Sequence, residues 1–361
     1  MSLADLQREY GDFHTPRFRV TVDGQPFTDA DGVIADLSVD TTLEGADTFA
    51  FTLAYPYDPE REGGTFLGLN WDLFAPDRPV EIAIGYEAPA DLTTVLVGKI
   101  AAVATEFPSS GMPTVKVSGF DLLHDLTDGT GDDAWTKTTD SAVVEDVAGK
   151  DAYGFTEVVA EATGTERPRV VQNERSDYDL LKELADRNGF ELFARGRTLY
   201  FRSPDYRSDP RVTLAYGRSL GSFSPEVNSA GQVDRVEVRY WNEKRKEEIV
   251  GAVSVEGDGG AGAGGEGKTR VLRARVESEA EAREVAAAAL ERITEGLVTG
   301  SGETVGIPAL RIGETIRLEG LGSRFTKVYY TTKVTHRVGG SGYGTSVGVT
   351  ESPHESARVP E

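Results

Sequence analysis

Alternation of apolar and polar residues is the feature that most restricts the fold of this chain. It runs from Phe18 to about Pro108 and returns after Tyr206, in short segments separated by glycine, aspartate and proline. Side chains of a β-strand point to opposite faces in turn, so a period of two predicts strands with one buried face. Short strands with turn residues between them are typical of an antiparallel barrel or sandwich.

The expected strands lie in two groups. Those of the first group are RFRVTVDG, two strands around EGAD in VIADLSVDTTLEGADTFAFTLAY, RPVEIAIGY and TVLVGKIAAVATEF. Those of the second group are RVTLAYG, QVDRVEVRYWN, EEIVGAVSV, ETIRLEGL, KVYYTTKVTHRV and YGTSVGVT. We therefore predict a mainly β fold with an α+β insert between the two groups.

The segment from residue 111 to 205 changes character and predicts a small α/β unit. TVKVSGFDLLHDL is expected to be a strand that turns at Gly119 into a short helix. A second helix, with Ser141 as its cap and Gly149 as its stop, is predicted from apolar residues at helical spacing, namely Val143, Val144 and Val147. The stretch YGFTEVVAEA fits a strand or a helix.

The most fully specified local structure lies at residues 172–201, QNERSDYDLLKELADRNGFELFARGRTLYF. Ser176 is expected to cap a helix, with Asp179 in the capping-box position, and Gly189 is expected to end it in a left-handed conformation. One face of this helix is apolar and consists of Leu180, Leu181, Leu184 and Ala185. FELFA and TLYFRS then predict a hairpin across RGR.

The second β region, residues 206–361, contains a glycine-rich loop and the clearest helix of the chain. The loop, EGDGGAGAGGEG at 256–267, holds too much glycine to pack. A phosphate-binding function lacks support, because no strand-to-helix context with a Gly-Lys-Ser/Thr ending accompanies the loop. The helix at 278–293, SEAEAREVAAAALERI, is expected to begin with a capping box formed by Ser278 and Glu281.

Two pairs of expected strands share an order, although they share almost no identity. RPVEIAIGY with TVLVGKIAAVATEF, and GETIRLEGL with KVYYTTKVTHRV, each give an apolar strand, a loop and a long strand ending in a polar turn. This similarity indicates an internal repeat, and chance resemblance between two β meanders explains it equally well.

The composition limits the class of protein. With 361 residues, 39% of them hydrophobic, the chain can bury cores for two or three domains. No run of 18 apolar residues is present, so no membrane-spanning helix is expected. The first residues lack a basic start followed by an apolar core, so no secretory signal is expected. Because the chain contains no cysteine, disulfides, thiolate nucleophiles and cysteine-based zinc sites are excluded.

The charge is strongly acidic, with 60 Asp and Glu against 38 Lys and Arg and a net charge of −22. Such a field repels a phosphate backbone, so we predict no nucleic-acid binding. The acids are spread along the chain instead of forming a tail. Dispersed surface acids are typical of a protein adapted to high salt, and this halophile-like interpretation is favoured over a site for cations or for a basic partner.

Patterns of catalytic and metal-binding residues are absent from the sequence. The histidines are far apart and share no ligand spacing: His14, His124, His336 and His354. His336 ends a strand and is interpreted as a structural hydrogen-bonding residue. No Gly-x-Ser-x-Gly motif occurs, and the many carboxylates give no positive support to glycosidase chemistry. We therefore predict no catalytic, cofactor-binding or metal site, and a role in assembly.

Three stretches carry a resemblance to a known family. In VKVSGFDLLHDL the matching residues are Gly119, Asp121 and Leu126. In the helix and its approach they are Gln172, Ser176, Asp177, Leu181, Leu184, Ala185 and Gly189. In GIPALRIGETIRLEGLGSRFTKVYYTTKVTHRV they are Pro308, Leu310, Gly313, Phe325, Tyr329, Val334 and His336. In this order and spacing they resemble the late control D family of phage tail hub proteins, which is similar to the hub part of VgrG-type spikes and of extracellular contractile injection systems.

The resemblance spans about Val80 to Thr350 and implies a trimeric ring. Each chain would supply two barrel-like tube modules, residues 1–110 and 206–361, braced by the α/β domain at 111–205. Three chains would then place six modules around a channel and join a six-fold inner tube to a three-fold spike. We expect the subunit contacts on the strands near 80–107 and 312–338.

The sequence departs from the family pattern at three places. Glycine is usual where Lys327 stands, an aromatic residue is common in place of Leu180, and the loop at 256–267 resembles an insertion. VgrG-type proteins continue into a long β-helix, whereas only a short tail follows Val349, so a separate spike protein is expected to dock. The other expected partners are the inner tube protein and further baseplate components, with no cofactor. The particle would assemble in the cytoplasm before it acts as a phage or an extracellular injection device.

Two other functions stay open at this point. A β-rich binding module, of the tail-fibre or glycan-binding kind, would present aromatic platforms to solvent. An envelope or glycan hydrolase would need a cleft with two carboxylates at catalytic separation. The sequence also leaves open whether the particle is a phage tail or a domesticated injection system.

Overall fold

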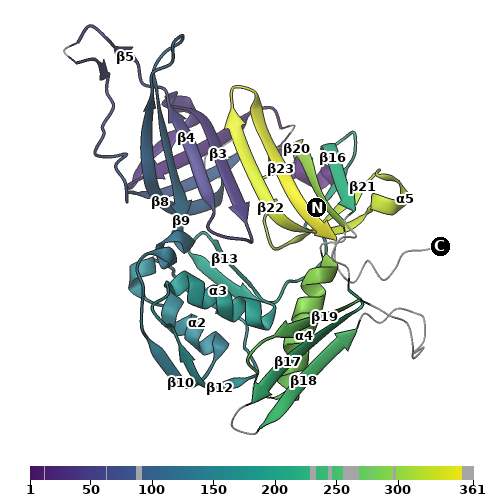
Figure 1. Ribbon diagram of the computed structural model, residues 1–361. Coiled ribbons are helices and arrows are strands. Elements are labelled where there is room, and N and C mark those ends of the chain that lie inside the picture. Colours follow the sequence, from purple (N-terminus) through teal and green to yellow (C-terminus); the bar gives the residue numbers. More distant parts are fainter. Residues whose placement is uncertain are drawn as a thin grey trace.

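The computed structural model describes residues 1–11, 13–61, 63–86, 92–227, 233–242, 246–254, 268–276, 278–295 and 298–351. The glycine-rich loop at 256–267 and His354 lie outside these residues. Strands account for 50% of the chain and helices for 18%, which confirms the mainly β prediction. One large curled sheet occupies the upper part of Figure 1, and two smaller α/β units lie below it.

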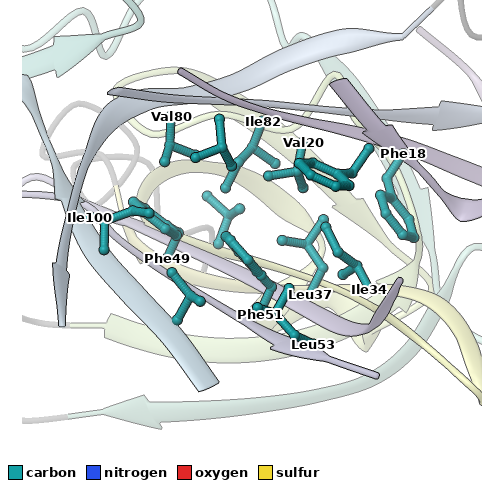
Figure 2. Packing of buried hydrophobic residues seen from close by; sticks show 14 of the residues in the cluster. Phe18, Val20, Ile34, Leu37, Phe49, Phe51, Leu53, Val80, Ile82 and Ile100 are labelled. Carbon is teal, nitrogen blue, oxygen red and sulfur yellow. The ribbon is translucent and has the colours of Figure 1, made fainter. Parts of the chain in front are cut away.

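The first half of the large sheet is built from N-terminal strands in the order β3-β4-β9-β8-β7-β1-β2, all antiparallel. They are β1 (Pro16–Val22), β2 (Gln25–Thr28), β3 (Ile34–Thr42), β4 (Thr48–Leu53), β7 (Pro79–Tyr86), β8 (Thr93–Glu106) and β9 (Thr114–Asp121). The strands curl around a core that includes Val20, Phe51 and Ile82 (Figure 2). The alternation in the sequence thus corresponds to one strand face turned toward this core.

The second half has the order β16-β20-β23-β22, with β21 beside the start of β22 and β15 parallel to β21. Its strands are β15 (Val212–Ala215), β16 (Leu220–Val227), β20 (Val298–Val305), β21 (Thr315–Glu319), β22 (Lys327–Gly339) and β23 (Gly342–Glu351). The alternation pattern does not predict helix α1 (Leu3–Tyr10), which packs Leu6 and Tyr10 into the core of this half. The remaining short elements are η1 (Asp29–Asp31), β5 (Tyr57–Asp58), β6 (Thr65–Phe66) and α5 (Gly322–Phe325).

The two halves contain the same five-strand unit. In chain order its strands are β3, β4, β7, β8 and β9 in the first half, and β16, β20, β21, β22 and β23 in the second. In both units the first strand pairs with the second, the second with the fifth, the fifth with the fourth and the fourth with the third. Of the two explanations that the sequence left open for the similar strand pairs, the strand order favours an internal repeat over chance resemblance, and the repeat extends over five strands.

The irregularities of the two units also coincide. In the fourth strand the register shifts at Ala101 in one unit and at Thr332 in the other, each time after three residue pairs with the fifth strand. In the first strand the shift lies at Ala35 and at Gly221, each time after one pair with the second strand. Because bulges bend a strand and increase its twist, the two units curl at equivalent places.

The segment after β9 folds into a small α/β unit, whereas β9 itself, expected within that unit, lies in the large sheet because it pairs with β4 and β8. Its elements are η3 (Leu122–Thr127), β10 (Ala134–Thr139), α2 (Asp140–Ala148), η4 (Asp151–Tyr153), β11 (Glu157–Ala160), β12 (Glu166–Val171), α3 (Asp177–Asn188), β13 (Glu191–Arg195) and β14 (Thr198–Arg202). The apolar face of α3 packs Leu181 and Leu184 against Leu199 and Phe201 of β14. The helix and hairpin thus share one core.

Local predictions for this unit are confirmed where the contacts span a few residues. The Ser176 hydroxyl accepts the N–H of Asp179 at 3.0 Å, and Gly189 ends α3 with φ of 69°. The predicted hairpin turns at Gly196, where φ is 62°. The ambiguous stretch YGFTEVVAEA forms a strand, β11, because it pairs with β14.

Two details of the prediction are wrong. Thr139, not Ser141, caps α2, since the Thr139 hydroxyl accepts the N–H of Ala142 while the Ser141 hydroxyl accepts the N–H of Thr163. The strand β9 does not turn at Gly119 but continues to Asp121, because β4 and β8 hold Gly119 on both sides.

Residues 235–295 form a second small unit, inserted between β16 and β20. Its sheet has the order β18-β17-β19, made of β17 (Arg235–Asn242), β18 (Glu247–Ser254) and β19 (Thr269–Arg273). Helix α4 (Glu279–Glu295) packs Ala282 and Ala286 against this sheet. The Ser278 hydroxyl accepts the N–H of Glu281 at 3.2 Å, as predicted, while the Glu281 carboxylate binds Arg167.

Candidate assembly surface

A polar face of the large sheet crosses the line between its two halves. On neighbouring strands, small or polar residues stand side by side in a row formed by Arg337, Ser38, Ala50, Ser118 and Ala102. A groove of about 540 Å³ runs over this face, and its polar lining includes Asp36, Lys116, Glu303 and Ser346. More of the exposed lining is polar than apolar, and it carries charges of both signs, so this face is suited to contact with water.

Histidine and metal chemistry finds no support in the described part of the chain. There, no group of three or more histidine, aspartate or glutamate side chains could hold a metal ion. His14 is exposed, and His124 stacks on Phe120 with 4.2 Å between the ring centroids. Within the same residues, no helix is long and apolar enough to cross a membrane.

His336 lies buried on β22, where the two halves of the sheet meet. Its Nδ1 atom lies 2.8 Å from the Tyr343 hydroxyl and 3.2 Å from the Thr345 hydroxyl. Burial, assisted by the positive charge of Arg311, lowers the pKa of His336 to about 3. The imidazole is therefore neutral and makes the structural hydrogen bonds predicted for it.

Two buried carboxyl groups lie where the sheet meets the α/β unit. Asp47 accepts the backbone N–H of Thr42 at 2.8 Å, and burial raises the pKa of Asp47 to about 8. Burial also raises the pKa of Asp121, and the neighbouring Asp47 carboxyl adds to this rise. The family-motif residue Asp121 is thus an interior acid that favours its uncharged form.

Arginine side chains connect the α/β unit, the turn at Gly313 and the first half of the sheet at this junction. Arg195 of β13 donates to the Ile312 carbonyl at 3.0 Å, and Arg202 of β14 donates to the Gly313 carbonyl at 2.6 Å. Arg311 donates to the Thr94 carbonyl of β8 at 3.1 Å. The turn at Gly313, another motif residue, is therefore held by the α/β hairpin on one side while Arg311 reaches the first half of the sheet.

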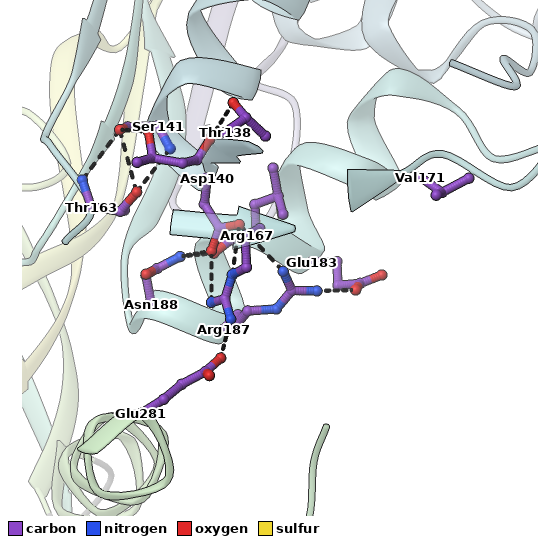
Figure 3. Close-up of polar contacts among 12 residues, drawn as sticks. Thr138, Asp140, Ser141, Thr163, Arg167, Val171, Glu183, Arg187, Asn188 and Glu281 are labelled. Atoms are coloured by element: carbon purple, nitrogen blue, oxygen red, sulfur yellow. Dashed lines mark hydrogen bonds and ion pairs between the residues drawn. The ribbon is translucent and has the colours of Figure 1, made fainter. Parts of the chain in front are cut away.

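An ion-pair network joins the α/β unit to the inserted unit (Figure 3). Arg167 donates through Nε and Nη2 to the two oxygens of Asp140, at 3.3 and 3.1 Å, and through Nη1 to Glu281 on α4. Asn188 and Arg187 of α3 also donate to Asp140. Asp140, Arg167 and Glu281 are buried, so each charge is stabilised by its partners in place of water, and the network holds the two units together.

The motif at the start of α3 forms a hydrogen-bonded turn. Gln172 is fully buried and donates to the Arg175 carbonyl at 2.9 Å and to Asp177 at 2.6 Å. Burial alone would raise the pKa of Asp177, but hydrogen bonds from Tyr153, Lys150 and Gln172 lower it. The motif residues therefore hold α3 in place, and none of them faces the polar groove.

Solved structures of phage tail proteins share this fold. The 43 kDa tail protein of prophage MuSo2 from Shewanella oneidensis superimposes with a TM-score of 0.74 at 14% identity, covering 94% of this chain and 99% of that one. A tail protein from Neisseria meningitidis gives 0.71 at 14% identity, covering 94% and 97%. An Escherichia coli component of the type VI secretion system gives 0.59 at 13% identity, covering 93% and 76%.

At these identities the likeness concerns the fold alone. The curated proteins include none that matches the chain. A family model described as Alg8 N-terminal domain matches residues 13–340.

Proposed function

The chain belongs to the Alg8 N-terminal domain family, and from this premise and the tail-protein fold we propose that it is the structural baseplate hub of a phage tail or contractile injection system. The hub acts as a homotrimer that joins a six-fold inner tube to a separate three-fold spike. Its role is geometric and requires no catalytic residue, metal or cofactor.

The observation that carries this proposal is the repeated five-strand unit with its coincident bulges. Two equivalent units in one chain give six equivalent positions in a trimer, so one ring can present six-fold contacts on one side and three-fold contacts on the other. The two tube modules lie in residues 1–121 and 206–361, since β9 (Thr114–Asp121) completes the first five-strand unit, and the unit at 235–295 is an insertion in the second. Residues 122–205 form the brace.

The polar face lines the channel in this proposal. Its short side chains leave space, and its mixed charges, such as Lys116 and Glu303, give no adhesive apolar patch. The contents of the inner tube can pass along such a surface without adhering to it. The inner tube protein, the spike and further baseplate components are the partners.

The native mass tests this proposal. Light scattering of the full chain in multimolar potassium chloride should give a trimer, and the trimer should loosen when the salt is diluted, because repulsion between acidic chains is then less screened. Negative-stain images of the same sample should show rings with a central opening. A monomer at every salt concentration would contradict the homotrimer and favour a binding module.

A further inference from the structure

We propose that neighbouring copies join by antiparallel pairing between β8 of one chain and β16 of the next, in one defined register. This agrees with the contact expected near 80–107 but replaces the one expected near 312–338, because β22 already pairs with β3 of its own chain. This inference deepens the proposed oligomer and rests on it. It follows from the repeat. Within the chain, the fourth strand of one unit already pairs with the first strand of the other, whereas the remaining fourth strand and the remaining first strand each lack such a partner among the described residues.

The complete contact is the seam between β22 and β3. On one of its edges, β22 pairs with β21 over residues 327–330 and then with β3 over residues 333–338. Strand β22 thus pairs first with a strand of its own unit and then with a strand of the other unit. The fourth strand of one unit meets the first strand of the other, antiparallel, and the polar face continues across the seam.

The equivalent strand β8 has only the first of these two neighbours. Its edge pairs with β7 over residues 93–99, and backbone hydrogen bonds on that side end at Ile100. In the described part of the chain, no strand occupies the same edge from Ala101 to Glu106. This stretch corresponds to the part of β22 that binds β3.

The equivalent of β3 is β16, and it also lacks a neighbour. β3 lies between β4 and β22, whereas β16 pairs with β20 and forms the end of the sheet among the described residues. Among the described residues, the chain therefore carries a free stretch of fourth-strand edge on β8 and a free first-strand edge on β16. These two edges are complementary in a head-to-tail arrangement.

Side-chain burial at equivalent positions supports the same pairing. At the intrachain seam Val338 is 6% exposed and Thr41 is 8% exposed. Their counterparts at the free edges are Phe107, 63% exposed, and Val227, 48% exposed. Large apolar side chains therefore stand exposed at the positions that the existing seam buries, and a second copy of this chain would bury them.

The coincident bulges fix the register. When the bulges of the fourth strands are aligned, Ala101 with Thr332, Ala104 takes the position of Thr335. When the bulges of the first strands are aligned, Gly221 with Ala35, Glu226 takes the position of Asp40. Thr335 pairs with Asp40 across the existing seam, where their side chains hydrogen-bond at 2.6 Å. Transfer of this register pairs Ala104 with Glu226, and its neighbours accordingly: Val103 with Val227, Thr105 with Pro225 and Glu106 with Ser224.

The new seam is weaker than its template for two reasons. Pro225 stands where Val39 pairs with His336, and proline has no N–H to donate across an edge. In the seam between β22 and β3, Arg337 lies diagonal to Asp40 and attracts it. In the proposed seam between β8 and β16, the equivalent positions hold Glu106 and Glu226, which repel each other. Salt screens this repulsion, so the seam closes at high ionic strength and opens at low ionic strength.

Cysteine cross-linking tests the register, and the full chain suits the test because it contains no cysteine. The predicted pair is Ala104→Cys with Glu226→Cys, since directly opposed residues of antiparallel strands have Cα atoms about 4.5–5.5 Å apart, within disulfide range. The slipped pair, Ala104→Cys with Ser224→Cys, serves as a control because diagonal residues lie about 7–8 Å apart. The template pair, Thr335→Cys with Asp40→Cys, should close within one chain.

Under mild oxidation in high salt, the predicted pair should give covalent dimers and trimers, and the slipped pair about a tenth as much. The template pair should stay monomeric and remain folded by circular dichroism. Trimers in light scattering without selective cross-linking would overturn this seam and leave the homotrimer standing. A chain that is monomeric at every salt concentration would overturn both.

Discussion

The two halves of the large sheet have the same strand order but distribute large and small residues differently. Between the second and fifth strands, the first half pairs Phe49 with Gly119, and the second half pairs Gly300 with Val349. The Phe49 ring covers Gly119, and the Phe223 ring covers Gly300. Register is therefore maintained by complementary size, which explains how the repeat keeps its bulges while its sequence similarity has almost vanished.

The halves also differ in what is inserted between equivalent strands. Residues 43–47 connect β3 with β4, whereas the unit at 235–295 lies between β16 and β20. The second half thus needs a further attachment, and the Arg167 network supplies it. Shared strands set the scaffold, and unequal connections give the two halves different neighbours.

Arg167→Ala should have the largest effect, because it breaks the attachment that only the second half requires. Removal of the guanidinium breaks two buried ion pairs, leaves Asp140 with Arg187 and Asn188 alone, and takes the Arg167 contact away from Glu281, which costs about 3–5 kcal/mol in the free energy of unfolding. Urea denaturation measures this loss. Arg187→Ala, which removes a more exposed partner of Asp140, should lose about 1 kcal/mol or less. Equal losses for the two variants would contradict a central role for Arg167.

Gly119→Val exchanges a residue of the first half for its counterpart in the second. A Cβ atom at Gly119 would lie within 2.7 Å of the Phe49 ring and closer still to the Lys99 carbonyl, so we expect a loss of about 3 kcal/mol from overpacking. Thermal unfolding measures it. Gly45→Val is the matched control, because no atom lies within 4 Å of a Cβ there. If Gly119→Val were as stable as this control, size complementarity would not hold the register.

Asp47→Asn tests a buried acid whose equivalent in the second half is Val298. The folded pKa of Asp47, about 8, lies above its value of 3.8 in the unfolded chain, so folding favours the protonated form. The corresponding stability is fully present below about pH 4 and is lost as the pH rises toward 8. The wild-type melting temperature should therefore fall between pH 5 and 8 more than that of the variant.

The exposed carboxylate of Asp128 provides the control for this experiment. Asp128→Asn should leave the pH dependence of the melting temperature as it is in the wild type. Asp47→Asn and the wild type should be compared with each other at each pH between 5 and 8, because the lowered folded pKa of His336 reduces the stability of both alike as the pH falls from 6.5 toward 3. Identical pH profiles for Asp47→Asn and the wild type would contradict the uncharged state of Asp47.

Glu106→Arg should have the smallest effect per contact, because it changes one exposed cross-strand pair. It gives the free β8 edge the charge that Arg337 supplies in the complete seam, and each seam should gain roughly 0.2–1 kcal/mol. Light scattering at low salt should then detect trimers at a lower protein concentration than for the wild type. The reciprocal change, Arg337→Glu, should weaken the intrachain seam by a similar amount without promoting association. A shift in association with Lys116→Glu as large as with Glu106→Arg would indicate a general charge effect.

Local structure could be predicted where the contacts span a few residues. Ser176 and Gly189 act within a turn of the chain and are recognisable from their sequence neighbours, as is the RGR turn that contains Gly196. Helix α1 was missed, although Ser2 and Asp5 form a capping box that gives a signal for its start. The Arg167 network could not be predicted, because Asp140 and Glu281 are close only after two units have packed.

The sequence by itself determined the mainly β character, the small α/β unit and the absence of disulfides, because alternation, helix caps and residue counts are local or compositional properties. Only the tertiary structure decided that Lys333 pairs with Thr42, that two bulges match across the repeat, and that β8 and β16 have unpaired edges in the described part of the chain. Strands with alternating apolar and polar residues have similar sequence patterns, so the pattern does not say which strand pairs with which. Their partners and register depend on complementary size across the sheet, a property of residues that are distant in the chain.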